Sequence, residues 1–118
     1  MFIKVWYLST CSTCRRIMKE LNLNEETATL QDIKAVPPSA ADIDFFYQKT
    51  QSYKALINGR SMEFRKRSIK PSEIDESRAK ELLLDHYAFL KRPVIQIDDR
   101  IFVGNSAKTI SEIKQHLN

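Results

Sequence analysis

The sequence predicts one α/β domain, because its two ends read strand–helix–strand and strand–strand–helix around a helical middle. The chain has 118 residues, a length typical of a single domain. Apolar residues make up 42% of the chain and charged residues 29%, proportions that indicate a folded protein. The order of the predicted elements therefore sets the fold class.

The N-terminal part predicts a βαβ unit. Residues 2–8 are mostly β-branched, aromatic and apolar, which is typical of a buried strand. Residues 9–13 then offer N-capping side chains, and residues 28–33 predict a second strand. Between them lies a helix with apolar residues at spacing i, i+3, i+4, i+7: Cys14, Ile17, Met18 and Leu21. A strand–helix–strand order predicts parallel strands joined by a right-handed crossover.

The middle of the chain, residues 38–90, is predicted to be helical. Ser39 is expected to cap a helix with Asp42 in its first turn, and the apolar stripe of that helix is Ile43, Phe46 and Tyr47. Ser72 and Asp75 resemble a capping box at the start of another helix. The inward residues of this helix are predicted to be Ala79, Leu82, Leu83 and Tyr87.

The C-terminal part predicts a hairpin and a helix. Residues 94–97 and 101–103 are apolar runs on either side of the polar turn 98–100, which favours an antiparallel hairpin. Residues 104–106 then begin the last helix, whose inward residues are Ile110, Ile113 and Leu117. The whole order is that of a thioredoxin-like (glutaredoxin-like) core with a mixed four-stranded sheet. This core is predicted to comprise residues 1–37 and 91–118, with residues 38–90 as an inserted helical subdomain.

Composition excludes several classes of function. The formal net charge of +4 allows an anionic ligand but gives no reason to expect direct nucleic-acid binding. The two glycines, Gly59 and Gly104, are too far apart for a Walker loop or a dinucleotide-binding turn. No apolar run is long enough for a membrane span, and the start of the chain does not resemble a signal peptide. We therefore expect a monomeric cytoplasmic protein whose two cysteines are reduced at rest.

A C-x-x-C motif at the predicted strand-to-helix junction is the strongest functional signal. The first turn of a helix stabilises an anion, and the thiolate is the reactive form of cysteine. Cys11 at the helix tip is therefore the expected nucleophile, and Cys14, on the apolar stripe, is the expected resolving thiol. Arg15 lies four residues after Cys11 and is expected to add a positive charge on the same helical face.

The two cysteines have two other interpretations. A zinc site would need Cys11, Cys14, His86 and His116, but the histidines are far apart in the sequence, so no metal is predicted. The cysteines could also be two ordinary residues at the start of a helix. The coincidence of the C-x-x-C motif, capping residues and βαβ order favours thiol chemistry instead.

Two arginines are candidates for binding an anion beside the thiolate. Arg92 precedes Pro93 at the entrance to the predicted strand 94–97, and its planar cation suits an oxyanion or a carboxylate. Arg60 follows the predicted turn at Asn58 and Gly59. Taken alone, each arginine is more often a solvated surface residue. The basic segment 60–70 is likewise usually a solvated face, although it could hold an acidic partner.

The sequence resembles the ArsC/Spx/YffB group, the arsenate reductase-related branch of the thioredoxin superfamily. The matching segments lie in order along nearly the whole chain: residues 7–16, 30–34, 56–60, 90–95 and 104–106. The resemblance implies Cys11 as nucleophile, Arg92 as an anion-binding residue and Pro93 as the cis-proline of the fold. It also implies that Arg60 matches an arginine of the Spx and YffB types.

Two departures from the group shape the expected function. Gly104 stands where arsenate reductases of this group usually have a further arginine, and Cys14 provides a second thiol where they commonly use one. We therefore expect a thiol–disulfide oxidoreductase acting on an oxyanion, a small thiol or a protein disulfide. No bound cofactor is expected, and glutathione or a thioredoxin or glutaredoxin system would serve as external reductant. The alternative is an Spx-like redox-sensing regulator that binds RNA polymerase.

Overall fold

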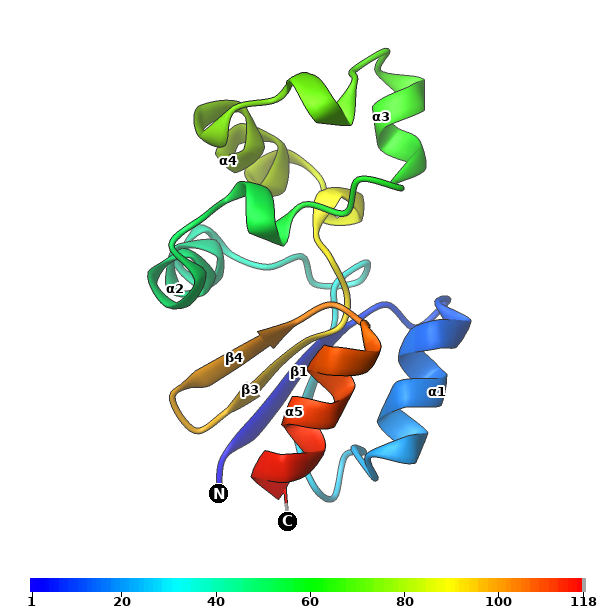
Figure 1. Cartoon of the computed structure of the whole chain (residues 1–118). Helices are drawn as coiled ribbons and strands as arrows, with labels where there is room; N and C mark the ends of the chain where they lie inside the picture. Colours follow the sequence, from blue (N-terminus) through cyan, green and yellow to red (C-terminus); the bar gives the residue numbers. More distant parts are fainter. Residues whose placement is uncertain (118) are drawn as a thin grey trace. The chain divides into compact units, whose positions relative to one another are not determined.

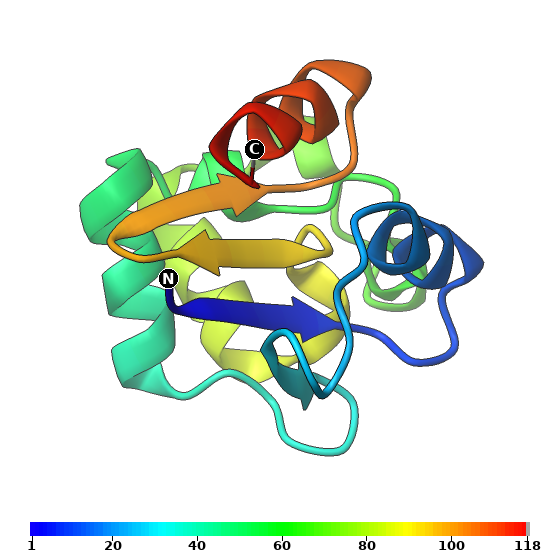
Figure 2. The ribbon, with the colours of Figure 1, turned by 90° about the horizontal axis from the view of Figure 1, so that it is seen from below.

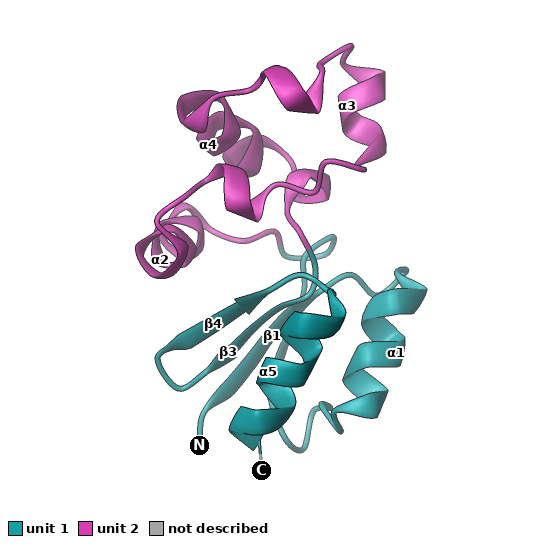
Figure 3. Ribbon diagram, viewed as in Figure 1, with its two compact units in different colours: residues 1–36, 92–118 teal, residues 37–91 magenta. Residues whose placement is uncertain are grey.

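The computed structural model describes residues 1–117 and shows an α/β fold with a four-stranded mixed sheet. The chain divides into two compact units (Figure 3). The first comprises residues 1–36 and 92–118, and the second comprises residues 37–91. The fold class predicted from the sequence, a thioredoxin-like α/β fold, is confirmed. Among the helices of the described residues, none combines the length and apolar character needed to cross a membrane.

The sheet of the first unit has four strands in the order β2-β1-β3-β4. They are β1 (Ile3–Tyr7), β2 (Thr29–Asp32), β3 (Val94–Ile97) and β4 (Arg100–Val103). β1 pairs with β2 in parallel, whereas the β1–β3 and β3–β4 pairs are antiparallel. Figure 2 shows the strands side by side in this order. The predicted parallel βαβ unit and antiparallel hairpin are both confirmed.

Two helices pack on one face of this sheet: α1 (Ser12–Glu20) and α5 (Ala107–Leu117) (Figure 1). Val5, Ile95 and Phe102 occupy matching positions on three neighbouring strands and therefore point to the same face. They form one apolar cluster with residues from the two helices and the segment after α1: Ile17, Met18, Leu21, Leu23 and Ile113. This cluster holds α1, and with it the C-x-x-C motif, against the sheet.

The second unit is helical, as predicted. Its α-helices are α2 (Ala40–Thr50), α3 (Met62–Lys66) and α4 (Glu76–Asp85). The short 3₁₀ turns η1 (Lys54–Leu56), η2 (Pro71–Glu73) and η3 (Tyr87–Phe89) alternate with them. Figure 1 follows these elements from cyan-green to yellow.

Polar contacts hold the first turns of α2 and α4. The predicted capping box of α2 is present, since Ser39 Oγ accepts from the Asp42 amide and Asp42 Oδ2 accepts from the Ser39 amide, each over 3.0 Å. In α4 the Glu76 carboxylate accepts hydrogen bonds from the hydroxyl of Ser52 and the amides of Tyr53 and Lys54, over 2.7–2.9 Å. Glu76 therefore fastens the start of α4 to the segment that follows α2.

Three details of the predicted elements differ from the structure. The expected pairing of Ser72 with Asp75 as a capping box is wrong, because Ser72 lies in η2 and the Asp75 side chain itself caps α4 by accepting from the Arg78 amide. Tyr87 lies in η3, beyond the end of α4, and is only half-buried. Arg100 pairs with Ile97 in the β3–β4 ladder, so the turn is shorter than predicted.

Candidate active site

The C-x-x-C motif lies where β1 ends and α1 begins. The Cys11 amide donates to the carbonyl of Leu8 over 3.0 Å, closing a tight turn directly after the strand. Cys11 is the N-cap of α1 in an extended conformation, and its carbonyl accepts from the Arg15 amide over 3.2 Å. The unpaired amides of the first helical turn therefore surround the Cys11 side chain.

The two thiols are free, and Cys11 is partly exposed whereas Cys14 is buried. Burial raises the pKa of the Cys11 thiol, but other interactions outweigh it and place the pKa below the ordinary cysteine value. These are interactions with the backbone N–H and the thiol of Cys14 and with the guanidinium of Arg92. Cys11 is accordingly the thiol with the greater tendency to ionise.

Cys14 has the opposite environment. Its side chain has no solvent exposure. Burial is the largest cause that raises its pKa to about 11, and the neighbouring Cys11 adds to the rise, while contacts with the Leu8 backbone and Arg92 partly offset it. At neutral pH Cys14 is therefore a protonated thiol next to a more acidic one. This asymmetry suits a pair in which one sulfur attacks first and the other acts later.

Arg92 lies beside Cys11 at the entrance to β3, and the Arg92–Pro93 peptide bond is cis. The loop after β4 holds this segment, since the Gly104 amide donates to the Pro93 carbonyl over 2.9 Å and Asn105 Nδ2 donates to the Arg92 carbonyl over 3.4 Å. The Arg92 Nε atom is buried, and among the described residues it has no hydrogen-bond partner. The Arg92 guanidinium acts on the Cys11 thiol through a hydrogen bond and through its charge, and both lower the pKa of that thiol.

Gly104 has a φ of 89°, which L-residues with a side chain rarely adopt. The resemblance implies an arginine at this position in arsenate reductases of the group. An arginine side chain would be strained in this backbone conformation. The structure therefore gives a physical reason for glycine at this position, where the loop turns back to Pro93.

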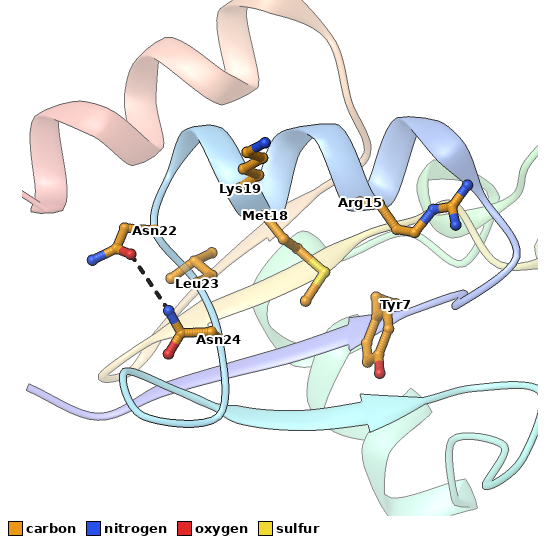
Figure 4. A pocket seen from close by; sticks show the side chains of 7 residues that line it. All are labelled: Tyr7, Arg15, Met18, Lys19, Asn22, Leu23 and Asn24. Carbon is orange, nitrogen blue, oxygen red and sulfur yellow. Dashed lines mark hydrogen bonds between the residues drawn. The ribbon is translucent and has the colours of Figure 1, made fainter.

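Arg15 lies one turn along α1 from Cys11, as its position in the sequence predicts. The largest contributions to the pKa shift of Cys11 come from other groups, however. Its side chain instead lines a cavity of about 350 Å³ on the flank of α1 (Figure 4). The expected role of Arg15 beside the thiolate stays a prediction.

Arg60 belongs to the second unit. Its amide donates to Asn58 Oδ1 over 3.1 Å, which fixes the turn that the sequence predicts at this point. Arg60, Arg65 and Lys70 line a cavity of about 360 Å³ within the second unit. The expected contact of Arg60 with a substrate stays a prediction. The roles of the other site residues stay predictions as well.

Asp32 is a residue of this site that the sequence reasoning missed. Its carboxylate accepts from the Ser9 hydroxyl over 2.6 Å, and from the amides of Ser9 and Lys34 over 3.3 Å each. The hydrogen bond from the Ser9 hydroxyl is the largest cause that lowers the pKa of Asp32. The carboxylate thus joins the end of β2 to the loop that carries Cys11. The sequence did carry one signal for this contact, because Asp32 ends a strand that was predicted to pair with β1.

Among residues 1–117, no cluster of three or more histidine, cysteine, aspartate or glutamate side chains is arranged to hold a metal ion. The C-x-x-C pair is accompanied instead by backbone amides and a guanidinium. These are groups that stabilise anionic sulfur and oxygen.

Comparison with known proteins gives one family. The model of the ArsC family matches residues 6–113. No curated protein sequence matches the chain.

Several solved structures share the fold. An arsenate reductase from Vibrio cholerae is 15% identical with a TM-score of 0.77, and the match covers 96% of this chain and 98% of that one. A Bacteroides fragilis protein described as ArsC family related is 21% identical with a TM-score of 0.76, over 100% and 98% of the two chains. A Brucella melitensis protein related to arsenate reductase is 22% identical with a TM-score of 0.69, over 98% and 96%.

Proposed function

The chain belongs to the ArsC family, and from this premise we propose that it is an arsenate reductase-like thiol–disulfide oxidoreductase. Cys11 is the nucleophile and Cys14 the resolving thiol. Arg92 stabilises the anionic sulfur and the anion that approaches it. The external reductant is glutathione or a dithiol of the thioredoxin or glutaredoxin type.

The observation that carries the proposal is that the pKa values of Cys11 and Cys14 are shifted in opposite directions. Cys11 has a lowered pKa beside Arg92 and partial exposure, so it ionises more readily than a free cysteine and is accessible. Cys14 has a raised pKa of about 11 and no exposure. In a pair of ordinary buried cysteines, the net shift of both pKa values would be upward, because burial disfavours the charged thiolate.

With a disulfide substrate, the reaction consists of two exchanges. The Cys11 thiolate attacks one sulfur, the substrate S–S bond breaks, and the leaving thiolate takes a proton from solvent. Cys14 then loses its proton to solvent or the leaving group and attacks Cys11 Sγ, which releases the second substrate thiol. The substrate has gained two electrons and the protein holds a Cys11–Cys14 disulfide, which the external reductant returns to two thiols.

An oxyanion is the second substrate class that the site supports, because Arg92 offers a guanidinium beside the nucleophile. With arsenate, Cys11 would form a sulfur–arsenic bond as water leaves. Attack by Cys14 on Cys11 Sγ would then release arsenite with the electron pair. Gly104 removes one cation from this class of site, so we expect disulfides to be reduced faster than arsenate.

The test is an NADPH-coupled assay in which arsenate, a model disulfide, glutathione and thioredoxin are each varied separately. We expect turnover of a disulfide, loss of turnover in Cys11→Ser, and a trapped mixed disulfide in Cys14→Ser. A trapped adduct in the Cys11 variant instead would reverse the two roles. Absence of turnover with every substrate, together with co-purification of RNA polymerase, would contradict the enzyme and support a regulator.

A further inference from the structure

The cavity on the flank of α1 is lined by apolar, cationic and amide side chains. Met18 and Leu23 are buried apolar residues, and the ring of Tyr7 is half-buried. Arg15, Lys19, Asn22 and Asn24 complete the lining. Figure 4 shows the cationic side chains on α1 and the two asparagines on the segment that follows it. The cavity therefore combines apolar, cationic and amide groups.

The charge of this cavity is uncompensated in the described residues. Neither Arg15 nor Lys19 has a carboxylate within ion-pair distance, and no acidic residue lines the cavity. Glu20, which follows Lys19, forms an ion pair with Lys114 over 3.3 Å instead. Two cations beside an apolar floor favour a ligand that has an anionic group on an apolar or amide-containing chain.

The asparagine side of the cavity is held in shape by its own hydrogen bonds. The Thr27 hydroxyl donates to the Asn22 carbonyl over 2.8 Å, and Asn24 Oδ1 accepts from the Glu26 amide over 2.8 Å. Asn22 itself has a φ of 55° at the end of α1. This turn therefore forms a fixed wall rather than a loose loop.

The position of the cavity relates it to Cys11. Arg15, Met18 and Lys19 follow the spacing i, i+3, i+4, which places them along one face of α1, and Asn22 lies just beyond the end of that helix. Cys11 precedes Arg15 by four residues, one turn back along the same line. With about 1.5 Å of rise per residue, Arg15 lies roughly 6 Å and Lys19 roughly 12 Å along the axis from Cys11. An extended tripeptide spans about 10 Å, which is enough to cover this distance.

We propose that this cavity binds the carboxylate-bearing chain of a small thiol while its sulfur is joined to Cys11. The inference rests on the proposed function and adds a substrate class to it. Arg15 receives a carboxylate close to the sulfur, Lys19 receives one farther along the chain, and Met18 and Leu23 contact the intervening atoms. The site thereby favours anionic thiols and disulfides over neutral or cationic ones.

The experiment measures how fast a mixed disulfide forms in the Cys14→Ser variant, where the resolving step is absent. The Cys11 thiolate attacks the probe, its S–S bond breaks and one thiolate leaves, so mass spectrometry can follow a single adduct. The probes are 3,3′-dithiodipropionate (anionic and short), glutathione disulfide (anionic and longer), 2-hydroxyethyl disulfide (neutral) and cystamine (cationic). Each rate is divided by the rate with the neutral probe, which removes any change in the reactivity of Cys11 itself.

Three substitutions in this background locate the effect. We expect Arg15→Ala to slow both anionic probes about two- to fivefold relative to the neutral probe, the range expected from one exposed ion pair. Lys19→Ala should slow glutathione disulfide by a similar factor and leave dithiodipropionate unchanged. Arg16→Ala removes the same charge from the neighbouring exposed position outside the cavity and should leave the relative rates unchanged.

The outcomes separate this inference from the function on which it rests. Equal relative rates for all probes, or an equal effect of Arg16→Ala and Arg15→Ala, would overturn the cavity as a binding site while leaving disulfide exchange intact. Failure of Cys11 to react even with the neutral probe would overturn the proposed function. Unchanged far-ultraviolet circular dichroism verifies that each variant is folded.

Discussion

The Ser9 hydroxyl donates a 2.6 Å hydrogen bond to Asp32, 23 residues later in the chain. This contact connects the loop before Cys11 to Asp32, the last residue of the neighbouring parallel strand β2. Because β1 and β2 run in parallel, their carboxyl ends meet at the same edge of the sheet. Cys11 therefore caps a helix that starts from a loop tied both to β1, by the chain, and to the end of β2, by this hydrogen bond.

The first prediction concerns Asp32 as a positioning residue. We expect Asp32→Asn to lower the free energy of unfolding by about 1 kcal/mol, a value reduced from that of a buried charged hydrogen bond because the site is near solvent. We also expect the alkylation rate of Cys11 to fall as its loop loosens. Measuring both in Asp32→Asn, Ser9→Ala and the double variant tests the coupling, and fully additive effects would contradict it.

The second prediction concerns the pH dependence of Cys11. A lowered pKa means that the thiolate persists to lower pH than in a free cysteine, so iodoacetamide should label Cys11 rapidly at neutral pH. Arg92→Ala should raise this pKa, and each unit of rise lowers the thiolate fraction about tenfold wherever the pKa lies above the working pH. A labelling profile unchanged by Arg92→Ala would exclude Arg92 as the stabilising cation.

The third prediction concerns Cys14. With its pKa raised to about 11 and its thiol buried, Cys14 should remain unlabelled in the reduced native protein at neutral pH. One labelled site per chain is the expected result under native conditions, and two after unfolding in denaturant. Two sites labelled at equal rates in the native protein would contradict the asymmetry of the pair.

The fourth prediction concerns the apolar cluster under α1. Ile95 has no solvent exposure and lies opposite both Val5 and Phe102 in the sheet. We expect Ile95→Ala to lower the free energy of unfolding by about 2–5 kcal/mol, because it removes buried contacts and leaves a cavity. Ile101, half-buried on β4, is the matched position, and Ile101→Ala should cost clearly less in chemical denaturation.

The fifth prediction concerns the acid sensitivity of the second unit. Hydrogen bonds from the Lys54 amide, the largest favourable contribution, and from Tyr53 and Ser52 lower the pKa of Glu76. The stabilisation is therefore complete above the unfolded-state pKa and is lost as the pH falls through the lower folded-state value. Glu76→Gln should lower the melting temperature at neutral pH and flatten its decrease in acid, and an unchanged acid profile would contradict this role.

Much of the architecture follows from local pattern. The apolar spacing of α1 and the β-branched character of β1 predicted these elements, because both bury one side against a common cluster. Element ends were harder to predict. The sequence predicted Ser72 and Asp75 as a capping box, whereas Asp75 itself is the cap, because a 3₁₀ turn of the folded backbone occupies Pro71–Glu73.

The sequence predicted those parts of the candidate site whose residues are neighbours along the chain. The C-x-x-C motif and its helix start are contiguous in the sequence, whereas the contact between Asp32 and Ser9 spans 23 residues and has no periodic signature. Spacing placed Arg15 on the face of Cys11. It could not show that the guanidinium lines the cavity on the flank of α1, or that Arg92 contributes more to the pKa shift of the thiol.

The second of the two boundaries between the units falls on the peptide bond between Lys91 and Arg92. The Lys91 amide donates to the Leu56 carbonyl inside the helical unit, while the next side chain along the chain faces the reactive sulfur. One peptide bond therefore joins a residue whose backbone is hydrogen-bonded within the helical unit to the guanidinium that lowers the pKa of Cys11.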